Sequence, residues 1–278
     1  MKSIKNLYKI GYGPSSSHTM GPSFAALNFL KSFPEADFIK VSLYGSLAKT
    51  GKGHGTDRAI KETLKSIETE ILFDTKTEDI DHPNTIDFIA YKNNIELGAK
   101  RYYSIGGGEI REDGNESLIP TEIYKEKNFS EIANMCKSRN IRLSDYVFEK
   151  EDSDIKQYLM AVWKTMQNAI NEGLRKSGTL PGGLSVERKA QFLYNQKHID
   201  ESPQTRENRL VCSYAFAVSE QNADCGIIVT APTCGSCGVL PAVLKYMQDK
   251  NNISNKTSNS KCTYNILISK IVFILHIF

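Results

Sequence analysis

The chain has 278 residues, enough for two ordinary domains, and 40% of them are hydrophobic and 24% charged. This composition is typical of a folded globular protein and excludes an intrinsically disordered one. The 35 basic and 32 acidic residues give a net charge of +3 without a long block of one sign, which argues against a nucleic-acid partner.

The first elements are expected near the N-terminus. Phe24, Leu27 and Leu30 recur at helical spacing, so we predict a helix that begins at Thr19 or Pro22. No apolar run long enough for a signal peptide precedes this helix. We therefore expect a cytoplasmic protein, whose six cysteines are reduced.

Strand and helix patterns then alternate. Apolar residues at every second position predict a strand over residues 39–43, followed by a glycine-containing loop over 44–55. A helix is predicted from Thr56, burying Ile60, Leu64 and Ile67, and further strands at 85–91 and 100–105. This mixture predicts an α/β domain.

The second half reads as mainly helical. Helices are predicted at residues 185–194, at 210–218, and from Gly238 with Pro241 in the first turn, where a missing N–H costs little. A longer helix before them has an apolar face of six residues: Ile155, Leu159, Val162, Met166, Ala169 and Ile170.

The predicted fold class is therefore α+β. We expect an α/β domain over residues 1–148 and a partial, mainly helical domain over 149–250. From Ile253 onward the sequence has no Gly, Ala, Pro, Asp, Glu or Arg, so we interpret residues 251–278 as an aberrant tail. Its most apolar part, residues 266–278, is shorter than the roughly 20 residues of a spanning helix, and no membrane partner is expected.

The first candidate site is the loop at residues 13–22. It brings hydroxyls and one imidazole to the entrance of a helix, where free backbone N–H groups favour a carboxylate. An imidazole there can also transfer a proton near neutral pH. A serine-rich surface loop is the alternative interpretation. The side chains concerned are Ser15, Ser16, Ser17, His18 and Thr19.

The second candidate site is the glycine-containing segment at residues 45–57. Its glycine and lysine spacing fits neither a phosphate-binding loop of the Walker type nor a dinucleotide fingerprint. Lys52, Gly53 and His54 are instead suited to the capture of a small anion before a helix. A solvated glycine turn is the alternative.

The third segment, residues 230–242, contains Cys234 and Cys237 at C-x-x-C spacing at the start of a helix, where a thiolate would be favoured. This spacing matches neither a paired zinc knuckle nor a ferredoxin-like run, so close loop–helix packing is the preferred interpretation. No metal ligand is assigned in the chain.

In this order, the segments at residues 13–22, 50–57, 104–108, 180–189 and 230–244 resemble the iron–sulfur L-serine dehydratases, or L-serine ammonia-lyases. The resemblance implies a 4Fe-4S cluster in which one iron acts as a Lewis acid on the serine hydroxyl, giving pyruvate and ammonia. It implies L-serine as substrate, and it leaves a homodimer open.

Carried over residue by residue, the resemblance makes His18 and His54 candidates for proton transfer or carboxylate binding. The remaining residues are expected to contact the substrate or to line the second-domain wall: Ser15, Ser16, Ser17, Thr19, Lys52, Gly53, Thr233 and Gly235.

The sequence departs from the family pattern in one respect. The resemblance ends near Asp249, before the three cysteine motifs that hold the cluster, so we expect a member truncated at its C-terminus with little or no activity alone. A non-catalytic module that binds a small amino acid is the alternative. A pyridoxal-phosphate dehydratase would need a Schiff-base lysine and a phosphate cup, and neither has a convincing motif here.

Overall fold

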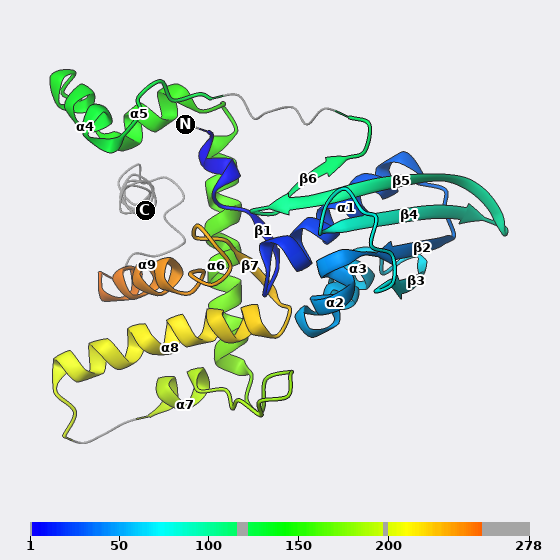
Figure 1. The fold of residues 1–278 in the computed structure, drawn as a ribbon. Helices are drawn as coiled ribbons and strands as arrows, with labels where there is room; N and C mark the ends of the chain where they lie inside the picture. The colour runs from blue at the N-terminus through cyan, green and yellow to red at the C-terminus, as the bar shows by residue number, and fades with distance from the viewer. Residues whose placement is uncertain (1, 116–121, 197–199, 252–278) are drawn as a thin grey trace.

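The computed structural model describes residues 2–115, 122–196 and 200–251. A mixed sheet with three helices forms one end of the molecule, and the later helices form the other end (Figure 1). This arrangement confirms the predicted α+β fold class. The predicted tail lies outside the described residues except for Asn251, as do His198 and Cys262.

The sheet has five strands in the order β3-β2-β4-β5-β6. β2 lies parallel to β3 and antiparallel to β4, and β4–β5 and β5–β6 are antiparallel pairs. Ile39, Val41 and Leu43 are fully buried, which confirms the alternation expected for this strand. The strand bounds are β2 Phe38–Leu43, β3 Glu68–Phe73, β4 Thr85–Lys92, β5 Ile95–Gly106 and β6 Glu109–Glu112.

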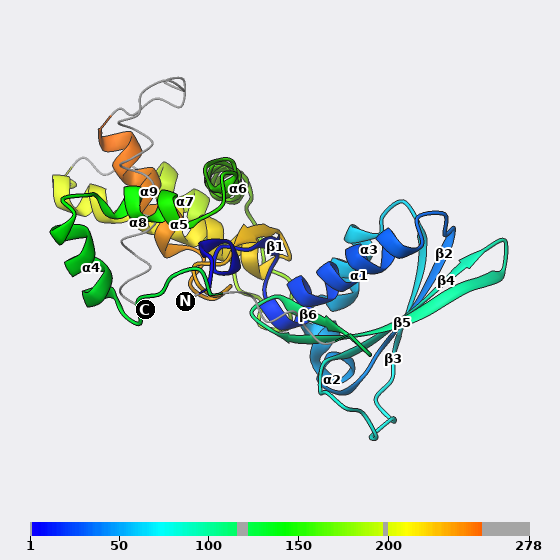
Figure 2. The same ribbon diagram turned by 90° about the horizontal axis from the view of Figure 1, so that it is seen from above.

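Helix α1 (Gly21–Ser32) lies with α3 (Thr56–Thr63) on one face of this sheet (Figure 2). The helix was predicted, although Leu27, one of the three residues whose spacing indicated it, is 43% exposed. Ala25, Ala26 and Phe29 are the fully buried residues. The two small side chains let the helix backbone approach the strands closely, and the aromatic ring fills the space beside them.

The expected loop at residues 44–55 is wrong: most of it forms α2 (Gly45–His54), which ends at Gly55 with φ +74°. Leu47 and Ala48 are buried, and Leu47 joins the same core as β2 and α1. This burial outweighs the low helix propensity of the three glycines in α2. The following helix α3 (Thr56–Thr63) begins where it was expected.

The long helix α6 (Ile155–Arg175) runs through the helical part, and all six residues of its predicted apolar face are buried. Helix α7 (Ala190–Asn195) is shorter than expected, because Ser185 has φ +49° and Thr179 bridges Glu187 in a turn. The other helices of this part are α4 Phe129–Ser138, α5 Leu143–Lys150, α8 Pro203–Ala223 and α9 Val239–Lys250.

The N-terminal residues pack with the helices rather than with the large sheet. Strand β1 (Ile10–Tyr12) pairs antiparallel with β7 (Ile227–Val229), and Ile4 and Tyr8 lie in the core around α6. Helices α4 and α5 contribute to the same core. Hydrophobic residues on both sides of residue 148 therefore share one core, and the division of the chain at that residue stays a prediction.

No helix among the described segments has the length and apolar character needed to cross a bilayer.

Gly173 marks a close crossing of α6 and α8, and its replacement tests this packing. A Cβ at this position would lie 2.2 Å from the carbonyl oxygen of Ala217, so we expect Gly173→Ala to lower the free energy of unfolding by at least about 2 kcal/mol. Urea unfolding measures the loss. Gly183→Ala is the matched control, since a Cβ there meets no atom within 4 Å. Equal stability of the two variants would contradict the crossing.

Candidate active site

His18 lies in a π-helical turn (Ser16–Met20) between β1 and α1. The Ser15 side chain caps this turn by accepting a hydrogen bond from the His18 N–H over 3.1 Å. The Thr19 hydroxyl is fully buried, 2.7 Å from the Tyr12 carbonyl oxygen and 2.5 Å from that of Ser15. The Thr19 hydroxyl therefore links the π-helical turn to the residues that precede it.

The two predicted histidines come together. The His18 and His54 rings stack with centroids 4.5 Å apart and planes inclined by 29°. His54 is the last residue of α2, and its Nδ1 lies 2.9 Å from the Thr50 carbonyl oxygen. Because a carbonyl only accepts, Nδ1 carries the proton. The Nε2 atom of the neutral His54 ring is therefore left with a free lone pair.

The His18 ring has hydroxyl partners at both nitrogens. Nε2 lies 3.1 Å from Ser46 Oγ and 3.1 Å from Thr50 Oγ1, and Nδ1 lies 3.4 Å from Ser15 Oγ. The sequence interpretation missed Ser46 and Thr50. They precede His54 at intervals of four residues, which places all three on one face of α2. The spacing was present in the sequence but has meaning only for a helix.

Two buried hydroxyls hold the backbone of the turn. Thr56 Oγ1 donates to the His18 carbonyl oxygen over 2.6 Å, and Ser104 Oγ donates to that of Ser17 over 2.8 Å. Glycines permit these approaches: a Cβ at Gly21 would lie 2.1 Å from Ser104 Oγ, and one at Gly51 would lie 2.8 Å from Thr56 Oγ1. Thr56 and Ser104 thus set the position of His18.

The pKa of His18 is lowered, first by burial of the ring and second by the neighbouring His54. A lowered pKa favours the neutral imidazole at pH 7. The lowered pKa also makes the stability of the fold depend on pH. Because the unfolded chain binds the His18 proton more readily than the folded chain, the contribution of His18 to the free energy of unfolding is complete above about pH 6.5 and is lost as the pH falls below that value.

Lys52 and Gly53 are exposed on the last turn of α2, and a Cβ at Gly53 would meet no atom within 4 Å. Among the described residues, none forms an ion pair with Lys52. Ser16 and Ser17 are half-buried. Lys52 lies two residues from both Thr50 and His54 on α2, so it does not share the helix face that carries Ser46, Thr50 and His54.

The structure does not bring Thr233 or Gly235 into contact with the histidines. Both residues are exposed, and the Thr233 hydroxyl lies 3.0 Å from Ser236 Oγ. The neighbouring cysteines are buried in a hydrophobic cluster, and burial raises the pKa of Cys234 to about 11 and that of Cys237 to about 12. A thiolate at this helix start is therefore disfavoured, and the burial agrees with the preferred interpretation of close loop–helix packing.

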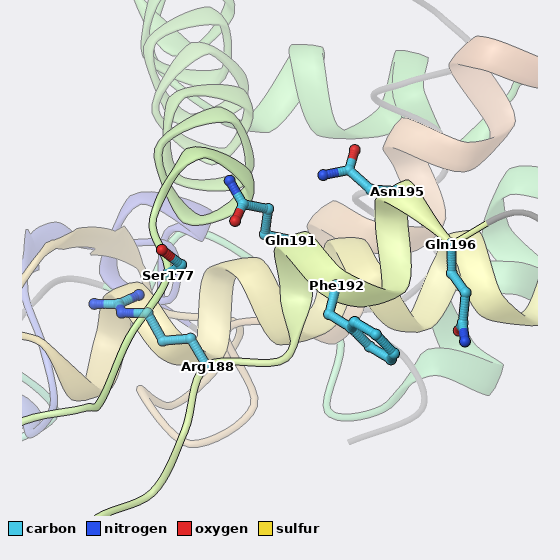
Figure 3. A pocket seen from close by; sticks show the side chains of 6 residues that line it. All are labelled: Ser177, Arg188, Gln191, Phe192, Asn195 and Gln196. Carbon is cyan, nitrogen blue, oxygen red and sulfur yellow. The ribbon is translucent and has the colours of Figure 1, made fainter.

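Metal ligands do not gather in the described part of the chain, where no group of three or more His, Cys, Asp or Glu side chains is arranged to hold an ion. A pocket of about 390 Å³ lies beside α7, and neither histidine lines it (Figure 3). It contains none of the predicted site residues. Its lining residues are Ser177, Arg188, Gln191, Phe192, Asn195 and Gln196.

Known families match both parts of the chain. The model described as serine dehydratase beta chain matches residues 3–69, and the one described as serine dehydratase alpha chain matches residues 59–276. The second match covers more than half of the chain, including most of the segment interpreted as a tail.

Relatives agree with these matches. The L-serine dehydratase of Haemophilus influenzae is 34% identical over 89% of this chain and 66% of its own length. L-serine dehydratase 1 of Escherichia coli is 32% identical over 88% of this chain and 66% of its own length. L-serine dehydratase 2 of Escherichia coli is 30% identical over 98% of this chain and 71% of its own length. The chain thus spans just under two thirds of the first two relatives.

Replacing Thr56 tests the support of the His18 backbone. Thr56→Val keeps the shape of the side chain but removes the hydroxyl that donates to the partly buried His18 carbonyl oxygen, so we expect a loss of about 1–3 kcal/mol in the free energy of unfolding. Thr56→Ser keeps the hydroxyl and serves as the control. Denaturant unfolding compares the two, and a valine variant as stable as the serine variant would contradict the assigned role.

Replacing His54 tests the coupling of the two rings. His54→Gln removes one of the two causes that lower the pKa of His18, so the pKa of His18 should rise. Titration of the ring resonances by NMR measures it. His82→Gln is the control, because the His82 ring packs against Tyr103 and not against His18. An unchanged His18 pKa in the His54 variant would refute the coupling.

Proposed function

The chain belongs to the serine dehydratase family, and we propose that it acts in the dehydration and deamination of L-serine to pyruvate and ammonia. The observation that supports this proposal is the stacked pair of His18 and His54, brought together from two separate segments. We place the proton transfer and part of the substrate binding at this pair.

His54 is suited to remove the α-proton of serine. Its Nδ1–H donates to a backbone carbonyl, which orients the ring and leaves Nε2 free to accept a proton. His18 is suited to a different task, because both of its nitrogens already have hydroxyl partners and its pKa is lowered by burial.

Lys52 is suited to attract the substrate carboxylate. It is separated by two residues from both Thr50 and His54 on α2, so its exposed side chain lies off their face and acts on an anion from a distance. The positive charge of Lys52 favours the presence of an anion near the exposed face of α2. Ser16 and Ser17 remain candidates for polar contacts with serine, as does Gly53, which leaves space beside them. The predicted contacts of Thr233 and Gly235 stay predictions.

The described residues do not fit the 4Fe-4S cluster that the family resemblance implies. Fe–S clusters need cysteine thiolates, whereas Cys234 and Cys237 are buried with raised pKa values. Cys136 and Cys225 are likewise buried, Cys212 is exposed on α8, and no three candidate ligands cluster in the described ranges. The chemistry that we assign to this chain therefore rests on its histidine loops.

This misfit favours a second candidate, binding of L-serine without turnover. The histidine pair and Lys52 could hold an amino acid even where no Lewis acid withdraws the hydroxyl group. Both candidates require that serine binds, and only the first requires pyruvate.

The test begins with binding. We expect L-serine to shift the ring resonances of His18 and His54 in NMR spectra of the full chain, and D-serine to shift them less. Lys52→Met should weaken this binding, whereas Lys49→Met, one turn earlier on α2, should not. Absence of any serine-dependent shift would contradict both candidate functions.

Turnover is measured after anaerobic reconstitution with iron and sulfide. If the chain forms pyruvate, His54→Gln should reduce kcat by at least about 100-fold with a much smaller change in serine affinity. His82→Gln should retain activity. Serine binding without pyruvate in the unaltered chain would support the binding module and reject the dehydratase for this chain.

A further inference from the structure

One corner of the helical part contacts the segment that precedes His18 and the segment that follows His54, which we call the two histidine loops. This corner, Asp224–Gly226, follows α8 and leads into β7. Cys225 Sγ lies 3.2 Å from the Gly13 carbonyl oxygen and 3.7 Å from the Gly55 carbonyl oxygen. The Gly13 N–H donates to the Gly226 carbonyl oxygen over 3.0 Å. One buried thiol thus lies between the loop that precedes His18 and the residue that follows His54.

The fit at this corner is tight on both sides. A Cβ at Gly55 would lie 3.1 Å from Cys225 Sγ, and a Cβ at Gly13 would lie 2.3 Å from Asn222 Oδ1. Gly55 also has φ +74°, which favours glycine, and Cys225 itself has φ +57°. The two loops and the corner therefore have little freedom to move past one another.

Charge adds a second link. Asp224 is only 19% exposed, and its carboxylate lies 3.3 Å from Arg58 Nη1, 3.2 Å from Lys176 Nζ and 2.8 Å from Arg188 Nη2. Arg58 belongs to α3, four residues after His54, whereas the other two cations belong to the helical part. The pKa of Asp224 is lowered, since the cations outweigh the opposing effect of burial.

We propose that Asp224 and Cys225 are positioning residues. They belong to the helical part, contact both histidine loops, and thereby keep the His18 and His54 rings at their stacking distance. Their effect on turnover rests on the proposed function, but their effect on ring geometry does not. Cys225 acts as a spacer and S–H donor rather than as a nucleophile, because burial raises the pKa of its thiol. The charged groups around it are Arg58, Asp224, Asp57 and Glu62.

Three variants of the full chain test the proposal. Cys225→Ala removes the donor and the spacer, Cys225→Ser keeps a small donor, and Asp224→Asn removes the charge that anchors Arg58. Cys136→Ala is the matched control, since Cys136 is also buried but lies in α4, in the core around α6. NMR titration of the His18 ring, without serine, is the readout, and thermal unfolding is recorded in parallel.

We expect the pKa of His18 to rise in Cys225→Ala and in Asp224→Asn. Loosening the loops moves His54 away and hydrates the His18 ring, and each change removes a cause of the lowered pKa. Cys225→Ser should keep the unaltered value. Cys136→Ala should lose stability without a change in the His18 titration, which separates positioning from a general loss of packing.

An unchanged His18 titration in folded Cys225→Ala and Asp224→Asn would overturn the proposal. If the alanine variant does not fold, Asp224→Asn decides by the same criterion. Failure of the proposed function gives a different result, because serine neither binds nor yields pyruvate while the His18 titration still responds to the corner variants.

Discussion

The candidate site depends on a close backbone approach between the turn that carries His18 and helices α2 and α3, which meet next to His54. Gly21 and Gly51 leave room for the Ser104 and Thr56 hydroxyls, and these hydroxyls bind the carbonyl oxygens of Ser17 and His18. A side chain at either glycine would push the turn away. The 4.5 Å stack of the two imidazoles follows from this approach, and so does the lowered pKa of His18.

The site also depends on a junction between the two halves of the molecule. The β1–β7 pair fixes the N-terminal strand to the helical part immediately before the His18 loop. The corner after α8 then reaches both loops through Cys225 and reaches α3 through the Asp224–Arg58 ion pair. A residue far from the histidines in sequence can therefore influence them through a few short contacts.

Several site residues could be found by pattern alone, and others could not. His18 and His54 stood out because each is the imidazole of a loop rich in hydroxyls or glycines, and the structure stacks them. Ser46 and Thr50 were missed because glycines indicated a loop where α2 forms. Burial of Leu47 and Ala48 against the sheet decided that helix, and local propensity cannot represent such packing.

The sequence by itself determined the α+β class, the buried face of α6, the alternation of β2 and the identity of the two imidazoles. Each of these depends on local periodicity or on a compact motif, which one stretch of chain contains completely. Only the tertiary structure decided that the N-terminal strand joins the helical part, and that Cys225 contacts both Gly13 and Gly55. Such contacts join residues as many as 219 positions apart, as in the pairing of Ile10 with Val229, and long-range packing, not local pattern, selects them.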